Sequence, residues 1–139
     1  MSAESDFEKT GGCLCNGVRY RVTGPLRPVV YCHCSQCRRT SGHFVAVTAV
    51  AKDALAVVAD KSLDWFTSSD VASRGFCKRC GSSLFWLPKA REYVCIMAGT
   101  LDESRGLEAV KHIYVKDKGD YYDLTDDLTK VPGRAGAFD

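Results

Sequence analysis

Seven of the eight cysteines in this 139-residue chain fall into three tight groups. The groups are Cys13-x-Cys15, Cys32-x-Cys34-x-x-Cys37 and Cys77-x-x-Cys80, and only Cys95 stands alone. The first ten residues, MSAESDFEKT, have no apolar core and predict no secretory signal, so we expect a cytoplasmic protein with reduced thiols. Thiolates at such short spacings are typical zinc ligands. The spacing therefore predicts metal binding rather than a disulfide framework.

The first and last cysteine groups each supply half of a tetrahedral metal site. The tight turn between Cys77 and Cys80 directs two sulfurs toward one ion, and Gly81 after it permits a positive φ. Asn16, which follows the other pair, also tolerates left-handed backbone. We therefore predict a closed, structural Zn²⁺ site, because four thiolates leave no position for chemistry. Its ligands are Cys13, Cys15, Cys77 and Cys80.

The middle group, Cys32, Cys34 and Cys37, has three thiolates and no evident fourth ligand. Three protein ligands with one open position are typical of a catalytic zinc, although His33 or His43 could close the site. Three thiolates on Zn²⁺ give the site a net negative charge and make the metal a weak Lewis acid. This chemistry favours holding an incoming thiolate as a nucleophile over hydrolysis.

The elements that must position these groups are short strands separated by turns. Val18, Tyr20 and Val22 alternate with polar residues, which predicts a half-buried strand. Further runs rich in β-branched and aromatic residues predict strands at 29–31, 44–50, 63–67, 83–87 and 93–98. The segment His112–Val115, with Lys118, Gly119 and Asp120 as a turn before Tyr121 and Tyr122, predicts a hairpin. The pattern indicates an all-β fold.

Composition limits the classes of protein that remain. With 45% hydrophobic and 26% charged residues, we expect one globular domain over residues 1–139. The longest apolar stretch, Phe44–Ala51, is too short to cross a bilayer. A formal charge of +2 is too small to indicate a membrane or nucleic-acid partner.

Five sequence blocks together resemble the glutathione-dependent formaldehyde-activating enzyme family, which also contains the centromere protein V type of protein. The blocks are GGCLCNGVRYRV, YCHCSQCRRTSGHF, RGFCKRCGSSLFW, AGTLD and HIYVKDKGDYYDLTDD. The resemblance covers the core of the expected domain, at about residues 11–133. The resemblance implies an open sandwich of twisted antiparallel sheets with zinc knuckles, similar to the zinc-binding accessory proteins of Rab GTPases. It implies two zinc ions, a structural one and an active one held by Cys32, Cys34 and Cys37. The implied activity is that of a carbon–sulfur lyase that adds glutathione to formaldehyde, giving S-(hydroxymethyl)glutathione.

Two arginines are candidates for binding the substrate, and two other functions are compatible with the same cysteine groups. Arg38 and Arg39 directly follow the middle group, where they could attract the carboxylates of glutathione or form a solvated surface pair. One alternative is a non-catalytic zinc module that binds a protein or a nucleic acid. The other is a thiol redox or zinc-buffering protein, which predicts a disulfide within the middle group.

Overall fold

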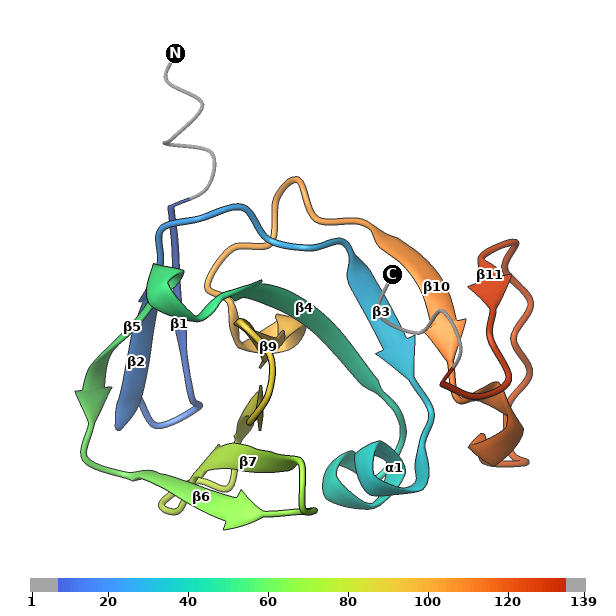
Figure 1. Cartoon of the computed structure of the whole chain (residues 1–139), viewed down its shortest axis with the longest axis horizontal. Coiled ribbons are helices and arrows are strands. Elements are labelled where there is room, and N and C mark those ends of the chain that lie inside the picture. The colour runs from blue at the N-terminus through green and yellow to red at the C-terminus, as the bar shows by residue number, and fades with distance from the viewer. Residues whose placement is uncertain (1–7, 135–139) are drawn as a thin grey trace. The chain divides into compact units, whose positions relative to one another are not determined.

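The computed structural model describes residues 8–134, which form two compact units (Figure 1). The first unit contains residues 8–27 and 48–106, and the second contains residues 28–47 and 107–134. Strand β4 (Val45–Ala51) carries the chain from the second unit into the first. The single domain expected over residues 1–139 stays a prediction, so we describe each unit by itself.

The first unit is built from antiparallel strands. A three-stranded sheet has the order β1 (Lys9–Gly12), β2 (Val18–Val22) and β5 (Leu55–Asp60). The other strands lie in the order β9 (Tyr93–Met97), β8 (Ser83–Pro88), β7 (Ala72–Cys77) and β6 (Leu63–Thr67). Two short 3-10 turns, η2 (Lys52–Ala54) and η3 (Ala98–Thr100), also belong to this unit.

The core of the first unit forms where the two groups of strands meet. The rings of Tyr20 on β2 and Phe85 on β8 lie edge to face with centroids 5.4 Å apart, and both are buried. The hydroxyl of Tyr20 is 2.8 Å from the Thr100 hydroxyl, so the one polar atom of the tyrosine side chain has a hydrogen-bond partner inside the core. Val18 and Val22 are buried beside Tyr20, which confirms the alternation expected from the sequence. The strands that carry the β1–β2 turn and the β7–β8 turn therefore share one hydrophobic core.

The second unit combines parallel and antiparallel pairing. Strand β3 (Val29–Cys32) pairs antiparallel with β4 and parallel with β10 (Ala109–Ile113), which lies beside it in Figure 1. Strand β10 also pairs parallel with β11 (Thr129–Lys130). Between β3 and β4 lies the short helix α1 (Ser35–Ser41), and no helix within residues 8–134 is long and apolar enough to cross a membrane.

The mostly β fold is confirmed, but the hairpin expected between His112 and Tyr122 is wrong. Strand β10 ends at Ile113, Tyr114 adopts a left-handed φ of 55°, and a 3-10 turn, η4 (Val115–Asp117), follows. The chain therefore leaves the sheet instead of folding back along β10. Tyr121 and Tyr122 lie in a loop, where their side chains contact histidines.

Candidate metal centres and an adjoining groove

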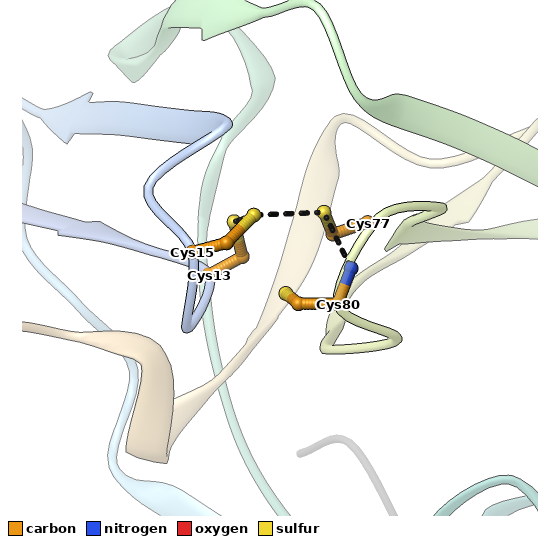
Figure 2. Close-up of side chains that lie close together, drawn as sticks. All are labelled: Cys13, Cys15, Cys77 and Cys80. Atoms are coloured by element: carbon orange, nitrogen blue, oxygen red, sulfur yellow. Dashed lines mark hydrogen bonds between the residues drawn. The ribbon is translucent and has the colours of Figure 1, made fainter.

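The first and last cysteine groups meet in the first unit. Figure 2 shows the side chains of Cys13 and Cys15, which follow β1, directed toward Cys77 and Cys80. Cys77 is the last residue of β7, and Cys80 lies in the turn after that strand. The four sulfurs lie within 4.8 Å of one another, and those of Cys15 and Cys77 are 3.6 Å apart. A tetrahedral zinc with a Zn–S bond of about 2.3 Å needs sulfurs about 3.8 Å apart. Both the donor atoms and their spacing fit one metal ion.

The backbone of both turns has the conformation that the sequence predicts. Asn16 adopts a φ of 63° and Gly81 a φ of 81°, both in the left-handed region. The positive φ at Gly81 is unstrained because the residue has no Cβ. A short asparagine tolerates the same region at Asn16. The left-handed backbone at these two residues turns the chain so that both cysteines of each pair face the cluster.

Two serines act on the sulfurs of this cluster. The Ser62 hydroxyl is 3.1 Å from the Cys77 sulfur, and the Ser82 hydroxyl is 3.2 Å from the Cys80 sulfur. The hydrogen bond with Ser82 is the largest cause that lowers the pKa of Cys80 to about 5. A thiol with this pKa is ionised at neutral pH, which is the form that binds metal.

The middle cysteine group forms a three-sulfur cluster in the second unit. Cys32 ends β3, Cys34 is the N-cap of α1, and Cys37 lies buried within the first turns of that helix. Their sulfurs lie within 4.8 Å of one another. Hydrogen bonds with the Cys32 and Cys37 thiols lower the pKa of Cys34 far below that of an ordinary thiol. The cluster therefore stabilises a thiolate and supplies three donors to a metal.

No histidine in the described part of the chain completes the three-sulfur cluster. The buried ring of His33 has its Nε2 atom 2.9 Å from Nδ1 of His112 and its Nδ1 atom 2.6 Å from the Tyr122 hydroxyl. The exposed ring of His43 has its Nδ1 atom 2.6 Å from the Tyr121 hydroxyl. Both nitrogens of His33 thus have partners other than a metal.

His33 belongs to a hydrogen-bonded chain that the sequence did not predict. His112 extends it, since its Nε2 atom is 2.9 Å from a carboxylate oxygen of Asp126. The carboxylate accepts from Nε2–H, so the Nδ1 atom of a neutral His112 accepts from His33, which in turn accepts from the Tyr122 hydroxyl. Burial and then the neighbouring His112 lower the pKa of His33 to about 4. His33 is therefore neutral at pH 7, as this direction of donation requires.

We expect replacement of His112 by alanine to lower the free energy of unfolding by about 2–4 kcal/mol, because it orphans the buried Nε2–H of His33 and opens a cavity. Urea unfolding followed by circular dichroism measures the change. Asp126→Asn keeps an oxygen that accepts from His112 and should cost less than about 1 kcal/mol. Equal losses for the two variants would show that the buried pair of rings is not what stabilises this region.

An open groove of about 550 Å³ adjoins helix α1 in the second unit. Its charged lining residues are Arg38 and Arg39 from α1, and Lys118 and Asp120 from the loop after η4. The sequence singled out both arginines, and both reach the groove. It missed Lys118 and Asp120, which it assigned to a hairpin turn.

The mostly β fold and the two cysteine clusters define a class of small proteins whose thiol clusters fit metal ions. Within this class the chain belongs to the glutathione-dependent formaldehyde-activating enzyme family, whose sequence profile matches residues 8–117. Membership supports a lyase-type function that involves glutathione and formaldehyde at the level of the family.

One curated protein and one solved structure are similar to this chain. An uncharacterised lyase of Schizosaccharomyces pombe is 27% identical over 119 residues, which cover 84% of this chain and 85% of the relative. A crystal structure of a Rhodobacter sphaeroides protein matches with a TM-score of 0.57 and 24% identity, covering 70% of this chain and 91% of that one. The second likeness shows the fold, and the first is to a protein that is named as a lyase.

Proposed function

We propose that this protein is a zinc-dependent carbon–sulfur lyase that adds the thiol of glutathione to formaldehyde and catalyses the reverse reaction. Cys13, Cys15, Cys77 and Cys80 would hold a structural zinc, and Cys32, Cys34 and Cys37 an active one. One observation carries the proposal: in a member of this family, three clustered thiols that no described histidine completes include Cys37, and the next residue in α1, Arg38, lines a cationic groove.

The reaction needs no oxidant and no second substrate beyond the aldehyde. The sulfur of the thiol forms a bond to the carbonyl carbon, the carbonyl π bond breaks, and the thiol proton ends on the oxygen. A zinc ion on three thiolates would supply a position for the incoming thiol and favour its thiolate form. Arg38 and Arg39 would attract the carboxylates of glutathione and keep the thiol beside the cluster.

The two alternatives make different demands on the site. A non-catalytic zinc module calls for a closed middle cluster, and the three-sulfur cluster beside a groove supports the enzyme instead. A thiol redox or zinc-buffering protein predicts a disulfide between Cys32 and either Cys34 or Cys37 after isolation in air, which titration of free thiols tests. The cytoplasmic location expected from the sequence stays a prediction.

The test combines metal analysis with exchange spectroscopy. We expect two zinc ions per chain, and faster exchange between hydrated formaldehyde and S-(hydroxymethyl)glutathione in ¹³C exchange NMR than in buffer alone. Protein stripped of metal by a chelator and reloaded with zinc should lose and regain the acceleration. Two bound zinc ions with no acceleration would overturn the enzyme and favour the zinc module.

A further inference from the structure

We propose that Ser62 and Ser82 protect the four-cysteine cluster from the electrophile that this protein handles. Each serine would donate a hydrogen bond to one zinc-bound sulfur and so lower the nucleophilicity of that sulfur. The inference rests on the proposed function, which gives this cluster a structural zinc and gives the protein an aldehyde as substrate. It explains how one chain keeps four thiolates inert while three others take part in chemistry.

An aldehyde can react with any zinc-bound thiolate that it reaches. Attack by the sulfur on the carbonyl carbon forms a carbon–sulfur bond and breaks the carbonyl π bond, and the oxygen takes a proton from water. The sulfur becomes part of a neutral thioether and loses the negative charge of the thiolate, which is the form that binds metal. A cysteine of a structural site must therefore bind zinc without acting as a nucleophile.

Ser82 faces Cys80, which is one of the two half-buried cysteines in the four-cysteine cluster. The serine oxygen accepts a hydrogen bond from the backbone amide of Leu14 at 3.1 Å and lies 3.2 Å from the Cys80 sulfur. A zinc-bound thiolate has no proton, so the serine hydroxyl is the donor in this second contact. Leu14 lies between Cys13 and Cys15 in the chain, so this one serine connects both halves of the cluster.

Ser62 supplies a second donor from the protein interior. Only 2% of this residue is exposed, and its hydroxyl lies 3.1 Å from the Cys77 sulfur. A buried hydroxyl needs a partner, and a zinc-bound Cys77 offers only an acceptor. Gly17 makes room for the contact, since a Cβ at that position would overlap the Ser62 oxygen. The serine proton is thus directed at the sulfur.

A hydrogen bond to a thiolate makes it a weaker nucleophile because it withdraws electron density from the sulfur. The nucleophilicity of thiolates falls with their basicity, with a Brønsted coefficient of about 0.4–0.5. A hydrogen bond that makes a thiolate about 100-fold less basic therefore slows its reaction about 10-fold. Contacts of this kind also support metal binding, since the partners of metal ligands typically contribute 10–100-fold to metal affinity.

Alkylation of the zinc-loaded protein, resolved by residue, tests the role of Ser82. Iodoacetamide labels each cysteine at a rate that peptide mass spectrometry measures. We expect Ser82→Ala to raise the rate at Cys80 about 10-fold and to leave the rates at the three-sulfur cluster unchanged. Ser82→Thr keeps the hydroxyl and should restore the wild-type rate. A wild-type rate at Cys80 in Ser82→Ala, or equal acceleration at all cysteines, would overturn the inference.

The spectrum of the cobalt-loaded protein tests Ser62, because burial closes Cys77 to the alkylating reagent. Sulfur-to-cobalt charge transfer moves to lower energy as the sulfur becomes richer in electrons. We expect Ser62→Ala to shift this band and to weaken cobalt binding about 10-fold. Thr48→Val is the matched control, since it removes a buried hydroxyl that donates to the Arg27 carbonyl oxygen and not to a sulfur. An unshifted band in Ser62→Ala, or the same shift in both variants, would overturn the role of Ser62.

Zinc content and formaldehyde exchange separate this inference from the proposed function. Two zinc ions per chain with unchanged reactivity and spectra in the serine variants would overturn the protective role and leave the lyase standing. The expected changes in the serine variants without any acceleration of exchange by the wild type would retain the protection and overturn the lyase. Absence of zinc from the four-cysteine cluster would overturn both the inference and the proposed structural zinc.

Discussion

Replacing Cys77 with serine should unfold much of the first unit and remove one of two bound zinc ions. The Cys77 sulfur is fully buried in the four-cysteine cluster, and it joins the turn after β7 to the turn after β1 through Cys15. A structural zinc contributes its binding energy directly to folding, so the loss should be on the order of 5 kcal/mol or more. Zinc content by mass spectrometry and thermal unfolding by circular dichroism measure the two effects.

Cys95→Ala is the matched control for the loss of a cysteine. Cys95 is buried in β9 but belongs to neither cluster. We expect this variant to keep both zinc ions and to lose only about 1–2 kcal/mol through the small cavity. A Cys77→Ser protein that unfolds at the same temperature as the wild type and keeps both zinc ions would contradict the structural role of the four-cysteine cluster.

The accuracy of the sequence-based prediction depended on how local the signal was. Strands β2 and β6 have the bounds expected, Val18–Val22 and Leu63–Thr67, because β-branched and aromatic residues between turns are visible in a short window. The prediction of a hairpin after His112 was wrong because it depended on a glycine turn, and a glycine turn is also compatible with a loop. Parallel pairing of β10 with β3 joins segments about eighty residues apart, and no local pattern reports it.

The same distinction applies to the sites. The cysteine groups were found because each is a local chelate of two or three ligands within a few residues. Asp126 and Tyr122 were not found, because the contact between His33 and His112 that brings them together spans 79 positions. Lys118 and Asp120 were missed for a related reason, since their position on the groove depends on the chain leaving the sheet at Tyr114.

The other large effect expected is the loss of activity in Cys34→Ser with little loss of fold. Serine is a good N-cap, so its hydroxyl can replace the Cys34 sulfur that accepts a hydrogen bond from the Cys37 amide, 3.3 Å away. It is a poor zinc ligand, which leaves two thiolates in the middle cluster. Changes to residues that merely support metal ligands typically cost 10–100-fold, so we expect the exchange rate to fall by at least about 100-fold.

The measurement compares this variant with Cys77→Ser in three respects: zinc content, thermal unfolding and ¹³C exchange between formaldehyde and glutathione. Cys34→Ser should keep one zinc ion and unfold within a few degrees of the wild type, because α1 retains its cap and the four-cysteine cluster is untouched. Binding of S-methylglutathione, which has no free thiol, should also persist, because Arg38 and Arg39 would attract its carboxylates without the cluster. Unchanged exchange in Cys34→Ser would sink the catalytic role of the middle cluster, because every other property of the site would have been preserved.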